Sequence, residues 1–187
     1  MRPLTDVGLP AGVCRGSTLD DQRHEASAWA KEWLAWRAPC SSKPAAVFDI
    51  DATLLHDSAR IEPVVDLYDF AKRSGVTVFI VTARSDEGKE YTHQELDKLG
   101  IERPRHLFMH PSSEPCANSQ DAARMKLRSR DRITKKGYEI ILNIGDAFSD
   151  HYVPPQHRAL QKSYGALQCG CFVDPNDGVA HVKLGHP

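Results

Sequence analysis

Long apolar runs are missing from this sequence of 187 residues. No stretch approaches the roughly 20 apolar residues that a membrane-spanning helix requires. Residues 1–20 also lack the continuous apolar segment that is typical of a secretory leader. We therefore expect a cytoplasmic protein that does not associate with membranes.

An excess of charge of one sign is also missing. Lys and Arg total 24 and Asp and Glu total 25, which gives a formal net charge of −1. Such a balance provides no global field that would attract nucleic acid or a membrane surface, although it leaves room for a local basic patch. The length and the 41% hydrophobic content are typical of one globular domain.

Cysteines are few, odd in number and scattered, which favours reduced thiols over a disulfide framework. Two of them stand one residue apart near the end of the sequence, without the two-residue spacing of a zinc knuckle. We therefore expect no metal role for them. The five are Cys14, Cys40, Cys116, Cys169 and Cys171.

Internal repeats and low-complexity segments are absent, and the pattern that is present alternates short apolar runs with amphipathic segments. The apolar runs are typical of strands buried on both faces of a parallel sheet. They occupy residues 45–50, 76–81, 105–109, 139–144 and 170–173. Helical spacing follows Pro63 up to Gly75, and returns at residues 86–99 and 119–136. This alternation predicts an α/β fold, a doubly wound parallel sheet with five core strands and helices between them.

The amino-terminal part divides into two segments. Residues 1–24 show no apolar period, so we expect a flexible arm ahead of a single domain at residues 25–187. Within that domain, residues 25–37 carry apolar side chains at helical spacing and predict an amphipathic helix. We expect this helix to pack on its own sheet; the alternatives are a lid over the active site or a dimer contact.

Two aspartates and a threonine follow the first predicted strand, as Asp49, Asp51 and Thr53. The carboxyl ends of parallel strands are where an open α/β sheet binds its ligands. Two carboxyl groups at this spacing can direct a nucleophile and a proton donor at one small volume. The alternative is structural, with Asp51 capping a turn and Asp49 paired with a lysine.

Polar residues also follow the second and fourth predicted strands. Thr82, with Ala83 and Arg84, offers a hydroxyl and backbone N–H groups to a phosphoryl oxygen, or else caps a turn. Asp146 is a candidate ligand for Mg²⁺, which prefers hard oxygen donors. Asp150 either orients that ligand or is simply a polar residue of the next segment.

A phosphoryl group among several carboxylates needs a compensating cation besides the metal. We select Lys126, which lies in the predicted helix before the fourth strand. Other basic residues of the segment Arg124 to Lys136 are expected to lie mostly on a solvated helix face.

The order of these motifs resembles that of the haloacid dehalogenase (HAD) superfamily. It runs from Asp49-x-Asp51-x-Thr53 through Thr82 and Lys126 to Gly145-Asp146-x-x-x-Asp150. More narrowly, residues 47–55 and 126–146 are similar to class B acid phosphatases, including plant vegetative storage proteins. The resemblance spans about residues 45–175 and implies a HAD-like Rossmannoid fold with little or no cap.

The resemblance implies a role for each of these residues in a Mg²⁺-dependent phosphomonoesterase. Asp49 would attack phosphorus and form an aspartyl-phosphate, and Asp51 would serve as general acid and then as general base. The phosphate would be bound by Thr53, Thr82, Ala83, Arg84 and Lys126. The metal would be held by the Asp49 carboxylate, the Asp51 carbonyl and Asp146, supported by Asp150.

The resemblance leaves the substrate open. We expect a phosphorylated small molecule; a large phosphorylated substrate or a nucleic-acid end, bound by the segment Arg124 to Lys136, is the alternative. The open site would otherwise be covered by the amino-terminal helix or by a second subunit in a homodimer. A phosphotransferase, or a non-catalytic storage or binding protein, could share the same fold. Two departures from the subgroup are Ala52, where relatives carry Glu or Gly, and the segment that begins at His151.

Overall fold

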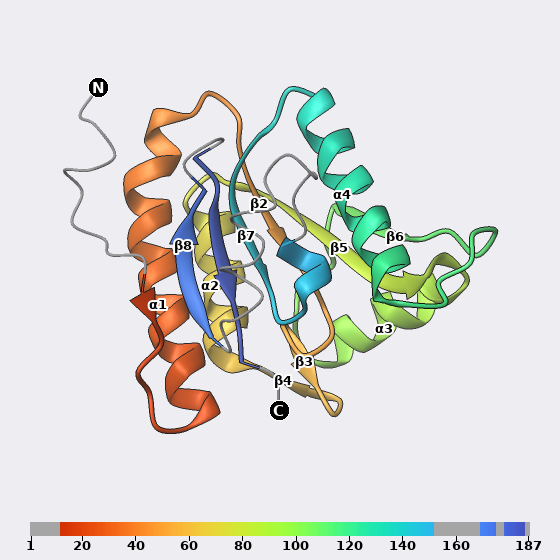
Figure 1. Ribbon diagram of the computed structural model, residues 1–187, viewed down its shortest axis with the longest axis horizontal. Helices are drawn as coiled ribbons and strands as arrows, with labels where there is room; N and C mark the ends of the chain where they lie inside the picture. The colour runs from red at the N-terminus through yellow and green to blue at the C-terminus, as the bar shows by residue number, and fades with distance from the viewer. Residues whose placement is uncertain (1–11, 152–168, 175–177, 186–187) are drawn as a thin grey trace.

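A seven-stranded sheet with helices on both faces forms the centre of the computed structural model, which describes residues 12–151, 169–174 and 178–185 (Figure 1). Its strand order is β1-β8-β9-β7-β2-β5-β6. The strands are β1 (Gly12–Val13), β2 (Pro44–Phe48), β5 (Thr77–Ser85), β6 (His106–His110), β7 (Glu139–Gly145), β8 (Gly170–Val173) and β9 (Ala180–Lys183).

Five neighbouring strands of this sheet, β9, β7, β2, β5 and β6, run parallel, which confirms the predicted doubly wound α/β fold. The predicted strand at residues 170–173 is present as β8, but it runs antiparallel to β9 and so lies outside the parallel core. The sequence pattern did not predict β9, because its four residues include His181 and Lys183 and form no continuous apolar run. The helix expected between residues 144 and 170 falls largely on residues 152–168, which lie outside the described residues.

The helices are α1 (Leu19–Arg37), α2 (Glu62–Arg73), α3 (Lys89–Lys98) and α4 (Ser119–Lys135), with short 3-10 segments at Ala38–Cys40, Asp86–Gly88 and Phe148–His151. Alternate residues of β2 show how the sheet is covered on both sides. Ala46 and Phe48 join the core beneath α1 and α2, whereas Ala45 and Val47 join the core beneath α4. Within the described ranges, no helix has both the length and the apolar character needed to cross a membrane.

Helix α1 begins at Leu19, six residues before the predicted start at Glu25. Its start is set by a capping box, in which the Thr18 hydroxyl accepts from Asp21 N at 3.0 Å and the Asp21 carboxylate accepts from Thr18 N at 3.1 Å. The first turn is polar, so apolar spacing alone could not reveal it. The prediction that this helix packs on its own sheet is confirmed, because the Trp33 indole donates to the Ile141 carbonyl of β7 at 2.7 Å.

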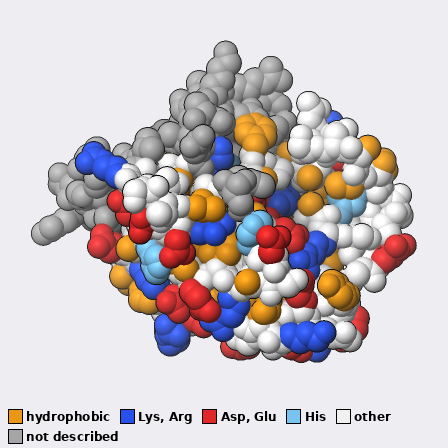
Figure 2. Space-filling model, turned by 90° about the horizontal axis from the view of Figure 1, so that it is seen from below, with side chains coloured by type: hydrophobic (Ala, Val, Ile, Leu, Met, Phe, Trp, Pro, Cys, Tyr) orange, Lys and Arg blue, Asp and Glu red, His pale blue; other side chains and the backbone are white. Residues whose placement is uncertain are grey.

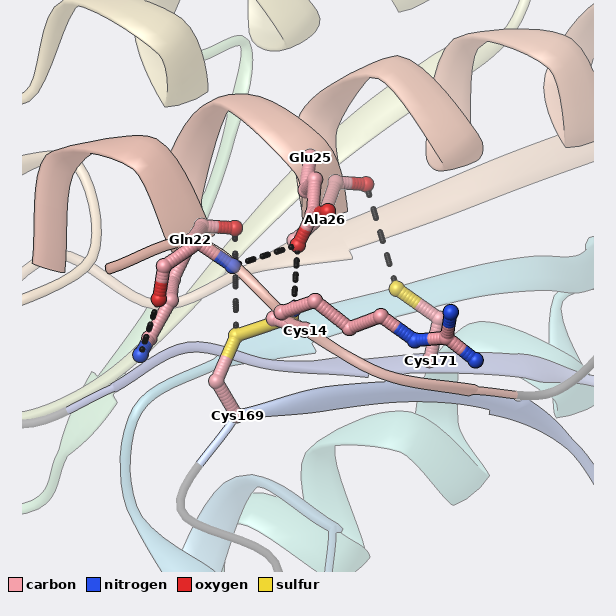
Figure 3. Close-up of a disulfide and its surroundings, with 8 residues drawn as sticks. Cys14, Gln22, Glu25, Ala26, Cys169 and Cys171 are labelled. Atoms are coloured by element: carbon pink, nitrogen blue, oxygen red, sulfur yellow. Dashed lines mark hydrogen bonds between the residues drawn. A yellow bond between two sulfur atoms is a disulfide. The ribbon is translucent and has the colours of Figure 1, made fainter. Parts of the chain in front are cut away.

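The expectation of reduced thiols is wrong for two of the five cysteines. Cys14 and Cys169 form a disulfide across 155 residues of sequence, with their Cα atoms 5.5 Å apart (Figure 3). Strand β1 pairs with β8 and brings the two together. A two-residue edge strand leaves no pattern in the sequence, so the pairing could not be foreseen. Cys40 and Cys116 are exposed and free, and Cys171 is buried and free.

A small hairpin of β3 (Leu55–His56) and β4 (Ala59–Arg60) follows the Asp49 loop. Its turn residues, Asp57 and Ser58, have φ values of 48° and 60°, the pair of positive values that a two-residue type I′ turn requires. This hairpin and α2 account for the chain between Thr53 and β5, so that segment contains no cap domain, in agreement with the sequence reading.

Candidate active site

The loop that follows β2 is built around one carbonyl. Ile50 O accepts hydrogen bonds from the backbone N–H groups of Thr53, Leu54 and Leu55 at 3.2, 2.8 and 3.0 Å. This tight turn forces Ala52 to a φ of 52°, a left-handed conformation that favours glycine. Asp49 N donates to Ile144 O of β7 at 3.1 Å, so the Asp49 backbone is tied to the strand that leads to Asp146.

Three buried carboxyl groups meet at the carboxyl ends of β2 and β7. Asp49, Asp146 and Asp150 each present an oxygen within 4.8 Å of the others, and their exposed fractions are 5%, 7% and 3%. Lys126, 3% exposed, reaches the same place from α4, with Nζ 2.9 Å from Asp49 Oδ1 and in an ion pair with Asp150. The structure therefore brings together four of the residues that the sequence singled out.

Burial dominates the electrostatics of this cluster. It raises the pKa of Asp49 to about 8, repulsion by Asp150 adds to the shift, and the Lys126 ammonium opposes it. Burial works against the charged form of Lys126, yet Asp150 and Asp49 outweigh it and raise the pKa of that lysine. The Asp49 shift is therefore caused mainly by burial, and the Lys126 shift by its two carboxylate partners.

The residues fit a divalent cation. When all three carboxyl groups are ionised, they and the Lys126 ammonium carry a formal charge of −2, which a divalent cation neutralises. The donors are hard oxygens, and the Thr53 hydroxyl, 3.5 Å from Asp146 Oδ1, adds a further oxygen nearby. Asp150 offers a carboxylate oxygen at the same spacing as the two expected ligands. The part expected for the Asp51 carbonyl stays a prediction.

Asp51 lies outside the buried cluster and binds Arg84. Its side chain is 59% exposed, and both of its carboxylate oxygens accept from the Arg84 guanidinium at 2.6 to 3.1 Å. On its other side Arg84 donates to Glu95 of α3 at 2.5 Å. Burial disfavours the charged guanidinium, but the hydrogen bonds with Asp51 and Glu95 raise the pKa of Arg84. Glu95 was not foreseen, since a glutamate within a helix resembles any surface acid.

Thr82 and Ala83 lie within β5, which extends to Ser85 rather than ending at the predicted Val81. Thr82 is fully buried, and its hydroxyl accepts from Arg84 N at 3.3 Å. The ladder between β5 and β6 shifts register between Val81 and Ser85. This irregularity interrupts the regular pairing of β5 with β6 around Thr82, as a β-bulge does when it redirects a side chain.

Figure 2 views the molecule from the end that carries the β3 and β4 hairpin in Figure 1. Acidic and basic side chains lie side by side across this face instead of forming separate patches. An anionic ligand would therefore be attracted by individual cations such as Arg84 and Lys126 rather than by a surface of one sign.

A family model matches residues 56–158, more than half of the chain, and its description is HAD superfamily, subfamily IIIB (acid phosphatase). The chain belongs to this family. The residues that match the acid phosphatase family include Lys126, Asp146 and Asp150, and they begin just after the Asp49 loop. The assignment of Asp49 as the nucleophile therefore depends on the sequence pattern and the geometry described above.

One curated relative and two solved structures are similar to this member of the acid phosphatase family. Vegetative storage protein 1 of Arabidopsis thaliana is 29% identical over 84 residues, which cover 45% of this chain and 30% of the relative. The class C acid phosphatase from Bacillus anthracis with tungstate bound has a TM-score of 0.66 at 14% identity, covering 92% of this chain and 80% of its own. A second structure of that phosphatase has a TM-score of 0.56 at 16% identity, covering 90% and 85%. At these identities the structures support the fold.

Proposed function

We propose that this protein is a Mg²⁺-dependent phosphomonoesterase that works through an aspartyl-phosphate on Asp49. The observation that carries the proposal is the buried contact of Asp49 with Lys126 beside Asp146 and Asp150. A carboxylate nucleophile needs a neighbouring cation that draws in the phosphoryl group, and it needs a site that excludes water. Membership of the acid phosphatase family supports the same chemistry.

In the first step, an Asp49 carboxylate oxygen attacks phosphorus while the bond from phosphorus to the leaving oxygen breaks. That oxygen takes a proton from Asp51 and departs as an alcohol. Lys126 and Arg84 stabilise the phosphoryl oxygens by charge, and the Thr82 hydroxyl and the Ala83 backbone N–H donate hydrogen bonds to them. A Mg²⁺ ion held by Asp49 and Asp146 would offset negative charge on the phosphoryl oxygens.

In the second step, water attacks the phosphorus of the aspartyl-phosphate and gives a proton to the Asp51 carboxylate. The bond from phosphorus to the Asp49 oxygen breaks, which regenerates the carboxylate and releases inorganic phosphate. Arg84 binds both Asp51 oxygens in the structure without substrate. We therefore infer that Arg84 transfers part of its hydrogen bonding to the arriving phosphate, which frees Asp51 for proton transfer.

The test is hydrolysis of an aryl phosphate by purified protein, with Mg²⁺ and with EDTA, beside Asp49→Asn. We expect activity that needs both the metal and Asp49. The matched control is Asp57→Asn, an exposed acid in the hairpin turn whose left-handed backbone asparagine tolerates. Full metal-dependent hydrolysis by Asp49→Asn would refute the mechanism.

The phosphotransferase alternative uses the same intermediate with an alcohol in place of water. The exposed Asp51 side chain favours it, because an acceptor alcohol can reach the general base from solvent. Adding glycerol to the assay distinguishes the two: a transferase yields glycerol phosphate, whereas a hydrolase releases only inorganic phosphate. A non-catalytic storage protein would give neither product.

A phosphorylated small molecule remains the substrate class that we propose. The nucleic-acid alternative depended on the basic residues of α4, and two of these are paired with acids: Arg124 with Asp121 at 2.7 Å and Arg128 with Glu114. Such pairing reduces the positive charge available to a phosphate backbone. The homodimer stays a prediction, which sedimentation can test.

The cytoplasmic location also stays a prediction, and the Cys14 to Cys169 disulfide argues against it. Cytosolic thiols are kept reduced, whereas disulfides persist in oxidising compartments. We therefore propose that the protein works where this disulfide is retained.

A further inference from the structure

The segment Gly145–His151, here called the acidic loop, carries two of the three clustered carboxylates. Four buried polar side chains contact it: Asn143 of β7, Arg130 of α4, His181 of β9 and its own His151. Their exposed fractions range from 1% to 9%. The proposed mechanism uses none of them, although burying four polar groups next to one short loop is costly unless their hydrogen bonds repay it.

Asp150 is held at its backbone and at its carboxylate. Its carbonyl accepts from Asn143 Nδ2 at 2.6 Å and from Arg130 at 2.7 Å, and its Oδ2 accepts from Ala147 N at 3.0 Å. The loop folds back so closely that a Cβ on Gly145 would lie 2.3 Å from the Asp150 carboxyl group. Glycine is therefore required where the loop begins.

His151 closes this loop, and its tautomer follows from its partners. Its Nε2 lies 3.2 Å from Gly145 O, and because a carbonyl can only accept, Nε2 must carry the hydrogen. A neutral imidazole carries one ring hydrogen, so with that hydrogen on Nε2 the Nδ1 of His151 is an acceptor. That Nδ1 lies 3.3 Å from His181 Nδ1, which must then be the donor.

His181 is fixed in turn by its surroundings. Its ring stacks on Phe172 with centroids 5.0 Å apart and planes 9° apart. Burial lowers the pKa of His181 well below its usual value, which favours a neutral ring. Asn143 Nδ2 also lies 3.3 Å from His181 Nδ1. Because both atoms are donors once the tautomer is assigned, this contact is not a hydrogen bond, and Asn143 donates to the Asp150 carbonyl instead.

We propose that His151 and His181 form a tautomer-locked pair that holds the acidic loop closed and so keeps Asp146 and Asp150 at the spacing that a divalent cation needs. His151 is a positioning residue, since it acts through the Gly145 carbonyl rather than on the reacting atoms. Assigning the cation rests on the proposed function, whereas the closure of the loop does not. Partners that orient metal ligands typically change metal affinity or activity 10–100-fold.

The first test is calorimetric titration of the purified protein with Mg²⁺. His151→Phe removes both ring nitrogens, and His151→Gln keeps an N–H donor near the Nε2 position. We expect roughly 10–100-fold weaker Mg²⁺ binding for His151→Phe, and recovery of most of the affinity with His151→Gln. The matched control is His106→Phe, because His106 also stacks on an aromatic ring, 4.7 Å from Phe79, at the opposite end of the parallel strands.

The second test needs no metal. In EDTA, amide hydrogen exchange should become faster at Ala147, whose N–H binds Asp150, in His151→Phe but not in His106→Phe. Nitrogen-15 spectra should show hydrogen on Nε2 of His151 and on Nδ1 of His181.

The outcomes separate the two proposals. Wild-type Mg²⁺ affinity in His151→Phe, equal loss in His151→Gln, or the opposite tautomers would each overturn the positioning role. A wild-type protein that takes up no Mg²⁺ would instead refute the proposed function. The exchange rate of Ala147 would then decide the role of His151 by itself. If His151→Phe does not fold, His181→Phe, which keeps the ring stack and removes the donor to His151, takes its place.

Discussion

Asp49 and Asp51 are two residues apart and occupy opposite environments. Asp49 is 5% exposed among other charged groups, while the Asp51 side chain is 59% exposed and bound to Arg84. Strand β2 ends at Phe48 and the turn around Ile50 O begins directly after Asp49, so the extended backbone that would keep both carboxyl groups on one side is lost. The proposed mechanism makes the buried Asp49 the nucleophile and the exposed Asp51 the general acid.

Glu95 holds the far side of the Arg84 guanidinium, and both side chains are at most 20% exposed. Glu95→Gln removes the charge but keeps a hydrogen-bonding side chain, so Arg84 should be less well fixed for phosphate. We expect KM for an aryl phosphate to rise about 3–10-fold, equivalent to roughly 0.7–1.4 kcal/mol of binding, with a smaller change in kcat. Steady-state kinetics will measure this.

The control for Glu95→Gln is Asp97→Asn on the same helix. Asp97 pairs with the half-exposed Arg103 at 2.6 Å, away from Arg84. Its kinetics should match the wild type, and an equal rise in KM in both variants would contradict the role given to Glu95.

Ala52 adopts an unfavourable backbone conformation at the turn after Asp49. A left-handed backbone costs a residue with a Cβ roughly 1–2 kcal/mol, whereas the greater freedom of glycine in the unfolded chain costs about 0.4–1 kcal/mol. Ala52→Gly should therefore raise the free energy of unfolding by about 0.5–1 kcal/mol, measured by urea denaturation. Ala59→Gly, at a strand position without positive φ, should lower it, and a loss at both positions would show that Ala52 is not strained.

At the scale of the element, α1 is attached to the sheet by a buried hydrogen bond at an irregular point. The register between β2 and β7 shifts at Ala45 and Ala46, so Ile141 falls between paired residues of β7. Its carbonyl accepts from the Trp33 indole at 2.7 Å. The helix thereby satisfies a backbone group next to a bulge in the sheet.

Trp33→Phe keeps an aromatic ring and leaves that carbonyl without its indole donor. A buried polar group deprived of its partner costs about 1–3 kcal/mol, so the free energy of unfolding should fall by about that amount, measured by urea denaturation. The half-buried Trp36, which packs beside Trp33 at 5.2 Å between centroids, is the control. A loss in Trp36→Phe as large as in Trp33→Phe would mean that ring volume, rather than the hydrogen bond, accounts for the effect.

At the scale of the whole molecule, the Cys14 to Cys169 disulfide joins the edge strand β1 to β8. It encloses most of the chain. In the chain-entropy account, closing a loop of 100 residues or more lowers the entropy of the unfolded chain and raises the free energy of unfolding by up to about 4–5 kcal/mol. Reduction, or the double change of Cys14 and Cys169 to Ser, should lower Tm by several degrees, measured by calorimetry.

Alkylation followed by mass spectrometry checks the pairing directly. Without reductant, the exposed Cys40 and Cys116 should react in the native protein. Cys171 should react only after unfolding, because burial raises the pKa of its thiol to about 12. Cys14 and Cys169 should react only after reduction; their modification in the native, unreduced protein would contradict the disulfide.

The sequence by itself determined four of the five parallel strands, β2, β5, β6 and β7, and the acidic residues that meet at the carboxyl ends of two of them. Apolar runs identify strands buried on both faces, and in such a sheet the polar residues that follow β2 and β7 must converge, as Asp49 and Asp146 do. Neither inference requires knowledge of distant contacts, since local periodicity and the direction of the strands suffice.

Only the tertiary structure decided which groups pair across the sequence. The antiparallel edge with its disulfide, the binding of Arg84 by Asp51 and Glu95, and the pair of His151 and His181 all join segments that are separated in the chain. Such contacts depend on side-chain direction and burial in the folded molecule. A short edge strand or a single histidine carries no periodicity, so the sequence pattern could not reveal them.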